Sequence, residues 1–258
     1  MKKILYSILT FFFVLCINLQ ASMIIDSYKF DSAPVAPAFV PTDFSGCIVW
    51  LDGSDRDTVL KTLPSTPAGD GEAVRQWSDK SGEGNHFGES TGTHQPVYDW
   101  DTDGIEYAGA NPDHDRLTCD TDFSSYTDCT IFIVRKTSNT STIDFTEIDS
   151  SGTYGPVCKE SDGSTDTGVS VDDYYADGVL QSITTRGDLY TAYNTGAIVI
   201  MTLSGVSLAD YNAGLQLARY SGGGGFSFDG FHYEIIIYDS KLSPTDRGTV
   251  TTYLGRWL

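Results

Sequence analysis

The sequence predicts an all-β protein, either a sandwich or a barrel, for three reasons. Its 258 residues include 15 Tyr, 13 Phe and 26 Gly, residue types that favour pleated surfaces and tight turns. Short apolar segments alternate with clusters of Gly, Asp, Ser and Asn, as strands alternate with turns. Helical periodicity is almost absent before the C-terminus. A hydrophobic content of 40% supports a sizeable core and argues against global disorder.

Residues 1–22 are typical of a secretory signal peptide. Two lysines precede an apolar stretch at residues 4–19, and small residues follow it. This stretch is short for a membrane span, so we expect export without membrane insertion after the signal is removed. The protein would then be secreted or lie at the cell surface, and a retained anchor helix is the alternative. A start at Met23 would instead indicate a cytoplasmic or virion protein.

The chain is strongly acidic. It carries 35 Asp and Glu against 16 Lys and Arg, a formal net charge of −19. Such a surface repels phosphate backbones and anionic lipid head groups, so nucleic acid is not an expected partner. Carboxylate oxygens do suit Ca²⁺.

Four cysteines follow the signal segment: Cys47, Cys119, Cys129 and Cys158. They form no CxxC pair and show no Cys/His zinc spacing. In an oxidising compartment disulfides can form, and we predict a bridge between Cys119 and Cys129. Buried free thiols are the equally weighted alternative.

A proline-containing lead-in, residues 23–45, precedes the expected strands. The strands are predicted at residues 47–52, 73–79, 130–137, 142–148, 197–203, 214–220 and 231–239. In the last of these, alternation places Tyr233 and Ile235 on one face and His232, Glu234 and Ile236 on the other. Both faces carry apolar residues, which indicates a central strand covered on both sides. His232 is interpreted as a satisfied strand histidine.

A single helix is predicted, at the C-terminus. Ser243 is a suitable N-cap, Pro244 suits the first helical position, and Asp246 follows three residues after the cap. Apolar residues then recur at helical spacing, among them Val250 and Leu254. Because Thr and Gly lower its intrinsic stability, this helix must pack on the strands.

The segment QWSDKSGEGNHF, residues 76–87, joins a large apolar side chain to a polar turn. We expect Trp77 to be buried and Asp79 to accept backbone N–H groups of the turn. The glycines of the segment permit positive φ, and Asn85 tolerates it. The turn is either purely structural or a site in which Asp79, Asn85 and His86 face a sugar or an ion.

Several segments together resemble the concanavalin A-like lectin/glucanase superfamily, in its laminin-G-like jelly-roll branch from bacteria and phages. These segments are WLDGSD (50–55), QWSDKSGEGNH (76–86), DRLTC (115–119), TIFIVRK (130–136) and DGFHYEIIIYDSKLSPTDR (229–247). The resemblance covers roughly residues 44–258. It implies a two-sheet antiparallel β-sandwich with a short C-terminal helix, a jelly-roll domain over residues 46–258, and glycan binding more often than catalysis.

The same superfamily includes laminarinase-type hydrolases with a Glu-x-Asp-x-x-Glu strand signature. Glu147 and Asp149 match its first two positions. The second Glu would fall at Ser151 or Gly152, and neither side chain can act as a general acid. The match is therefore incomplete at the position that catalysis requires.

DWDTDG, residues 99–104, is the best metal candidate, since Asp99, Asp101 and Asp103 alternate before a glycine. The twelfth position is Ala110 and no helices flank the segment, so it is not an EF-hand. A Ca²⁺ site of another geometry and a simple acidic hairpin loop both stay open.

Sugars stack on aromatic rings while Asp and Asn bind their hydroxyls. Trp100, Tyr174 and Tyr175 lie in polar loop contexts that combine these residue types. The leading hypothesis is therefore a non-catalytic glycan-binding or adhesion module, with Ca²⁺ as a candidate cofactor. The alternatives are a structural or host-adhesion virion protein and a glycoside hydrolase of the same fold.

Overall fold

The computed structural model describes residues 38–108, 115–138, 145–146, 148–150, 153–155, 157–158, 162–164, 170–211, 213–218 and 228–258. A compact unit runs from Val40 to Leu258. The expected signal peptide, the Met23 start and most of the lead-in lie outside the described residues. Among the described residues, no helix combines the length and the apolar character needed to cross a bilayer.

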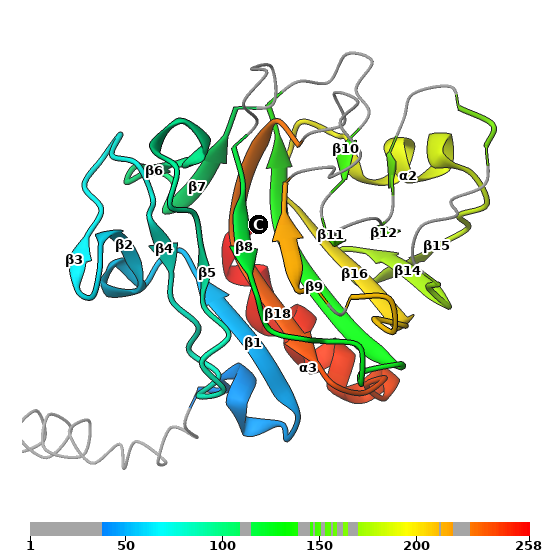
Figure 1. Ribbon diagram of the computed structural model, residues 1–258. Helices are drawn as coiled ribbons and strands as arrows, with labels where there is room; N and C mark the ends of the chain where they lie inside the picture. The colour runs from blue at the N-terminus through cyan, green and yellow to red at the C-terminus, as the bar shows by residue number, and fades with distance from the viewer. Residues whose placement is uncertain are drawn as a thin grey trace, which may run out of the picture. The chain divides into compact units, whose positions relative to one another are not determined.

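Sheet A is an antiparallel sheet whose central strands are long (Figure 1). The residues of these strands are almost all buried. Its order is β15 (Val179–Gln181), β14 (Asp173–Ala176), β16 (Val199–Val206), β9 (Cys129–Thr137), β18 (Gly230–Tyr238), β7 (Gly104–Tyr107) and β6 (Val97–Asp99), and β1 (Cys47–Asp52) also pairs with β18. All six residues of β1 are buried, so this strand is covered on both faces.

Sheet B faces sheet A and is built from shorter strands. Its order is β12 (Thr153–Tyr154), β11 (Ile148–Ser150), β17 (Leu215–Leu217), β8 (Leu117–Cys119), β5 (Phe87–Gly88), β4 (Gln76–Trp77), β2 (Val59–Thr62) and β3 (Thr66–Pro67). A separate ladder joins β10 (Phe145–Thr146) to β13 (Val157–Cys158). The two antiparallel sheets confirm the all-β prediction and resolve it in favour of a sandwich, an arrangement that fits a jelly roll.

The hydrophobic core lies between the inner faces of the two sheets. Sheet A contributes residues such as Ile133, Met201 and Ile235, and sheet B contributes Trp77 and Leu117. All five are fully buried. Trp77 is thus buried as expected, and its short strand ends where the polar turn begins.

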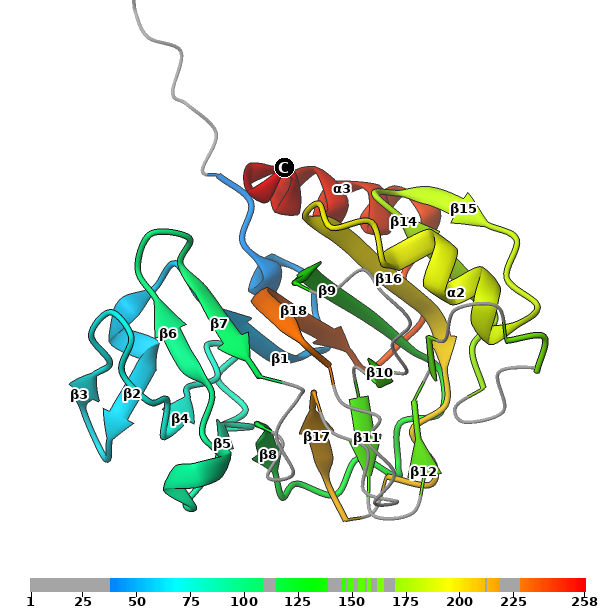
Figure 2. The ribbon, with the colours of Figure 1, turned by 90° about the horizontal axis from the view of Figure 1, so that it is seen from above.

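Two α-helices accompany the sheets in the described part of the chain. Helix α3 (Pro244–Leu254) covers the face of sheet A that points away from sheet B, as Figure 2 shows. Its cap is as predicted, because Ser243 Oγ accepts the backbone N–H of Asp246. Helix α2 (Arg186–Tyr193) was not predicted; Thr185 caps it. The described residues also form short 3-10 helices: η1 (Pro41–Asp43), η2 (Arg56–Thr58), η3 (Gly92–His94) and η4 (Gly255–Trp257).

Strand β18 departs from the simple alternation expected for it. Its register with β9 shifts between His232 and Glu234. His232 therefore joins the rings of Tyr107 and Phe228, with centroids 4.9 Å and 4.6 Å away, on the side of the core. Tyr233 and Glu234 instead contact Trp257 beyond helix α3. The bulge therefore places the consecutive residues Tyr233 and Glu234 on the same face of sheet A.

The expected strand boundaries hold best for the long strands of sheet A. Strand β1 was predicted to the residue, and β9, β16 and β18 differ from their predictions by at most three residues at either end. The strand expected at residues 73–79 is reduced to β4, and before it Ala73 forms an isolated antiparallel bridge with Val97 of β6.

Candidate functional site

The turn after Trp77 is closed by one carboxylate. Asp79 Oδ1 accepts the backbone N–H groups of Trp50 at 2.8 Å and Ser81 at 2.9 Å. Its Oδ2 accepts the backbone N–H of Asn85 at 3.0 Å and the hydroxyl of Ser81 at 2.7 Å. The expected closure of the turn by Asp79 is confirmed. Both oxygens already have partners in the protein, so a direct contact of Asp79 with a ligand stays a prediction.

Asn85 joins the turn to β1 and to the segment that follows β8. Its Nδ2 donates to the carbonyl of Ile48 at 2.8 Å, and its Oδ1 accepts the hydroxyl of Thr121 at 2.7 Å. The side chain is buried within the protein, and its contact with a ligand also stays a prediction. Gly82 and Gly84 adopt φ of 95° and 76°, as expected for this turn.

His86 differs from its neighbours because it is exposed. Its Nδ1 accepts the backbone N–H of Asp79 at 2.9 Å. The ring lines an open depression of about 510 Å³ on the outer face of sheet B. Of the three turn residues selected from the sequence, the structure places His86 at a cavity.

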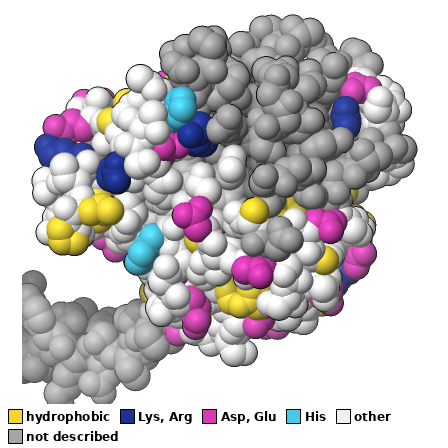
Figure 3. All heavy atoms as spheres, in the orientation of Figure 1, with side chains coloured by type: hydrophobic (Ala, Val, Ile, Leu, Met, Phe, Trp, Pro, Cys, Tyr) yellow, Lys and Arg dark blue, Asp and Glu magenta, His cyan; other side chains and the backbone are white. Residues whose placement is uncertain are grey.

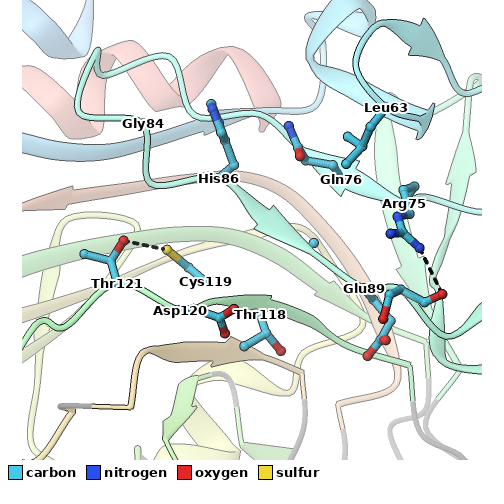
Figure 4. Close-up of a pocket in the computed structure, with 12 residues that line it drawn as sticks. Leu63, Arg75, Gln76, Gly84, His86, Glu89, Thr118, Cys119, Asp120 and Thr121 are labelled. Carbon is cyan, nitrogen blue, oxygen red and sulfur yellow. Dashed lines mark hydrogen bonds between the residues drawn. The ribbon is translucent and has the colours of Figure 1, made fainter.

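The floor of this depression crosses three strands (Figure 4). Gly88 of β5 pairs with Gln76 of β4 on one side and with Thr118 of β8 on the other. Because Gly88 has no side chain, the surface between the two polar side chains is hollow. The depression is lined by Leu63, Arg75, Gln76, Gly84, His86, Gly88, Glu89, Ser90, Thr118, Cys119, Asp120 and Thr121.

Charged side chains of both signs stand at one end of the depression. Arg75 Nη1 donates to the carbonyl of Ser90 at 2.9 Å, a bond drawn in Figure 4. Glu89 is 8% exposed, and its Oε2 lies 2.6 Å from Nε of Arg116. Its Oε1 accepts the backbone N–H of Thr91 at 2.7 Å. The arrangement offers hydrogen-bond donors and acceptors on fixed strands, which suits a polar, uncharged ligand.

Most residues of the depression were missed by sequence analysis. Gln76 lies on β4 and Thr118 on β8, and these two strands meet because each pairs with β5. Arg75 directly precedes β4 and Asp120 directly follows β8, so residues far apart in the sequence line one depression. Local pattern did identify His86, through the polar turn in which it lies.

Trp100 is 42% exposed and lies at the end of β6, outside the lining of the depression. Its indole Nε1 donates to the carbonyl of Ala68 at 3.1 Å, and the guanidinium of Arg56 lies 4.5 Å from the ring centroid. The ring is therefore held in place on the surface. Its role as a stacking platform for sugar stays a prediction.

The structure separates the two tyrosines predicted as sugar contacts. Tyr174 packs against the core and lines another depression, of about 380 Å³, beside β15. The ring of Tyr175 lies 4.1 Å from the guanidinium carbon of Arg247, on the side of helix α3. Since neighbouring residues of a strand point to opposite faces, Tyr174 and Tyr175 do not share one site.

The three aspartates of the metal candidate have different environments. Asp99 Oδ1 accepts the backbone N–H of Asp101 at 2.8 Å, an Asx-type turn. Asp103 Oδ1 lies 3.0 Å from Nη2 of Arg56 and also accepts the hydroxyl of Tyr98. Over the described ranges, no three His, Cys, Asp or Glu side chains converge so as to hold a metal ion. Calcium binding stays a prediction.

A buried carboxylate that sequence analysis did not select anchors the C-terminus. Glu234 is 0% exposed, and it accepts hydrogen bonds from Trp50 Nε1 at 2.9 Å, Tyr253 Oη at 3.0 Å and Trp257 Nε1 at 2.7 Å. Arg256 Nη2 lies 2.8 Å from its Oε2. Burial raises the pKa of Glu234, and the charge of Arg256 opposes this rise. These contacts fasten helix α3 and η4 to sheet A.

The predicted bridge between Cys119 and Cys129 is wrong, since both are free, as is Cys47. Cys119 ends β8 in sheet B whereas Cys129 begins β9 in sheet A, so the connection between them crosses from one sheet to the other. Burial raises the pKa of the Cys47 and Cys129 thiols to about 12. The alternative of buried free thiols is confirmed for these three cysteines. The side chain of Cys158 lies outside the part of the chain that the structure describes.

Catalysis by the partial hydrolase signature is not addressed by the structure. Glu147 lies outside the described residues, and Asp149 is described only through its backbone pairing in β11.

Figure 3 shows acidic side chains scattered among basic, polar and a few hydrophobic ones on the described part of one face.

Comparisons with known proteins leave the family open. A scan against protein-family models finds no match, and a search of curated proteins finds no similar sequence. Among solved structures, a Trypanosoma rangeli sialidase in complex with the inhibitor DANA aligns with a TM-score of 0.43 at 11% identity, over 91% of this chain and 38% of the sialidase. The binding domain of botulinum neurotoxin DC in complex with SialylT aligns with a TM-score of 0.40 at 13% identity, over 83% of this chain and 52% of the toxin domain. The chain thus spans about half or less of either structure. At this level of similarity, neither assigns it to a family, and the concanavalin A-like superfamily stays a prediction.

Proposed function

We propose that this chain is a non-catalytic glycan-binding module, with the depression over Gly88 as its sugar site. The observation that carries the proposal is the hollow formed where a glycine is flanked by Gln76 and Thr118 on neighbouring strands. Sugars present many hydroxyl groups, each of which donates and accepts hydrogen bonds. A depression with amide, hydroxyl, imidazole and guanidinium groups on its surface complements them.

The position of the site on sheet strands supports the proposal further. Trp77 and Phe87, on the inner face of the same strands, are both 0% exposed. Their burial fixes the backbone under the depression, so little order must be gained when a ligand binds. The net charge of −19 favours neutral glycans over acidic ones. We further propose that the module acts outside the cell, as its signal-like N-terminus predicts.

The test is affinity gel electrophoresis of the full chain in gels that contain dextran, xylan, a mixed-linkage β-glucan or galactomannan. We expect at least one of these polysaccharides to retard the protein. Thr118→Trp fills the hollow over Gly88 and should weaken binding at least tenfold. Val179→Trp, on an exposed site of β15 outside the depression, is the matched control and should bind as the unchanged protein does.

Three outcomes count against the proposal. Retardation in none of the gels would contradict glycan binding, and equal binding by Thr118→Trp would contradict the site. Release of reducing sugar from the retarding polysaccharide would overturn the non-catalytic part.

A further inference from the structure

We infer that His86 determines specificity in this depression by donating a hydrogen bond from Nε2 to an acceptor oxygen of the bound sugar. The inference rests on the proposed function, because it assigns a role to one residue of the proposed site. The inference predicts that the ligand atom next to Nε2 of His86 is an oxygen that accepts a hydrogen bond.

The backbone fixes which nitrogen of His86 carries the proton. The N–H of Asp79 donates to Nδ1 at 2.9 Å, so Nδ1 must be unprotonated. A neutral imidazole then carries its single proton on Nε2. His86 is therefore a donor, and not an acceptor, toward whatever approaches Nε2.

The ring is also held in place before a ligand arrives. Asp79, whose N–H holds Nδ1, is itself bound through Oδ1 to the backbone of Trp50 in β1. Its Oδ2 accepts the N–H of Asn85, the residue that directly precedes His86. Both ends of the turn therefore meet at one carboxylate. A donor fixed in this way loses little conformational entropy on binding, which raises its contribution to affinity and selectivity.

The location of His86 gives this donor a ligand to meet. The ring is exposed and His86 belongs to the lining of the depression, with Gln76 between it and Arg75 in Figure 4. A sugar that lies over Gly88 with a hydroxyl or ring oxygen at His86 completes the hydrogen bond. A sugar that lacks an oxygen there leaves the donor without a partner and binds less well.

Two amide substitutions separate the two nitrogens of the ring. His86→Asn places an amide oxygen near the position of Nδ1, so it keeps the acceptor for Asp79 N–H but has no group that reaches the position of Nε2. His86→Gln places its amide near Nε2, so it keeps a donor toward the ligand but loses the acceptor for Asp79. Each substitution is made in the full chain. The variants are run in affinity gels that contain the polysaccharide, among the four, that retards the unchanged protein most. Their urea denaturation is measured in parallel.

We expect His86→Asn to keep a denaturation midpoint close to that of the unchanged protein and to lose about tenfold in affinity. We expect His86→Gln to lower the midpoint and to retain more affinity than His86→Asn. If His86→Asn binds as the unchanged protein does, the inference is overturned, while weak binding by Thr118→Trp still supports the sugar site. If both variants lose stability and affinity in parallel, His86 has only a structural role. If no gel retards the unchanged protein, the proposed function fails first.

Discussion

At the scale of single residues, Asp79 shows how an acidic side chain becomes part of the framework. Its carboxylate accepts four hydrogen bonds, which come from Trp50, Ser81 and Asn85. These bonds connect the end of β4 to β1 in the facing sheet. A polar turn can therefore follow the buried Trp77 directly, because the turn has its own internal partners.

Replacement of Asp79 by Asn should destabilise the protein by about 2 kcal/mol, because the amide nitrogen would face donors in place of one oxygen. Urea denaturation at neutral pH measures the change. Asp101→Asn is the control, since the side chain of Asp101 is exposed, and its cost should stay within about 0.5 kcal/mol. Equal stabilities of the two variants would contradict the role given to Asp79.

The three described thiols should be unreactive in the folded protein. Cys47, Cys119 and Cys129 are at most 7% exposed, and burial raises the pKa of each. Since the thiolate is the reactive form, Ellman's reagent should modify them only after addition of urea. Alkylation followed by peptide mass mapping identifies each site. Rapid labelling of Cys119 in the native protein would contradict this prediction, since Cys119 is only 2% exposed beside the depression.

Residue chemistry was readable from the sequence only where partners lie close along the chain. The closure of the turn by Asp79 depends on Ser81 and Asn85, and it was predicted. The bond from Trp50 Nε1 to Glu234 joins residues far apart in the sequence, and no local pattern indicates it. The depression over Gly88 was not predicted for the same reason, since no local pattern in the sequence indicates it. The importance of Gly88 arises from Gln76 and Thr118 beside it.

At the scale of secondary-structure elements, helix α2 depends on its cap more than on an apolar face. Only Leu189 and Tyr193 of its eight residues are buried. Asp188 accepts hydrogen bonds from the backbone N–H and the hydroxyl of Thr184 and from the backbone N–H of Thr185. The weak periodicity explains why sequence analysis missed this helix, whereas the Ser-Pro start of α3 was recognised.

The cap of α2 should fail in acid. The hydrogen bonds from Thr184 and Thr185 lower the pKa of Asp188 to about 2. Because the folded pKa lies below the unfolded value of about 3.9, the unfolded state binds more protons between these values. The stabilisation by Asp188 is therefore complete above pH 4 and is lost as the pH falls through about 2. Denaturation of the protein and of Asp188→Asn across this range should give midpoints that converge in acid; a constant difference would contradict the assignment.

The attachment of α3 and η4 should depend on Glu234. Glu234→Ala leaves Arg256 and three neutral donors without their shared acceptor, and we expect a loss of about 3 kcal/mol. Urea denaturation followed by tryptophan fluorescence is suitable, because Trp50 and Trp257 both contact Glu234. Glu83→Ala, at an exposed position of the polar turn, is the control and should change stability little. A loss below about 1 kcal/mol for Glu234→Ala would contradict this role.

At the scale of the whole molecule, two sheets and one helix form successive layers (Figure 2). The long strands of sheet A are buried on both faces, which explains why their apolar segments were predicted well. The strands of sheet B are two to four residues long, and the outward-facing residues of β4, β5, β8 and β17 are partly buried. Short strands carry a weaker pattern, so the location of the depression could not be predicted although the fold class could.

Removal of helix α3 should expose the outer face of sheet A. Trp50, Phe132 and Ile236 lie outside the core between the sheets, and each is at most 8% exposed in the complete chain. A chain that ends at residue 243 should therefore bind anilinonaphthalene sulfonate or aggregate. A chain that starts at residue 38 retains the compact unit and should unfold cooperatively, as measured by circular dichroism. Cooperative unfolding of the first variant without dye binding would show that α3 is not a required layer.

The pairing of β18 has a consequence for how the protein is made. One edge of this strand binds β7 through Gly230–His232 and β1 through Glu234–Tyr238, while the other edge binds β9. Among the strands in the described part of the chain, β18 comes last in the sequence and is therefore the last of them to leave the ribosome. Until it emerges, the nascent chain holds β1, β7 and β9 with no common neighbour, so sheet A closes only after β18 has been synthesised.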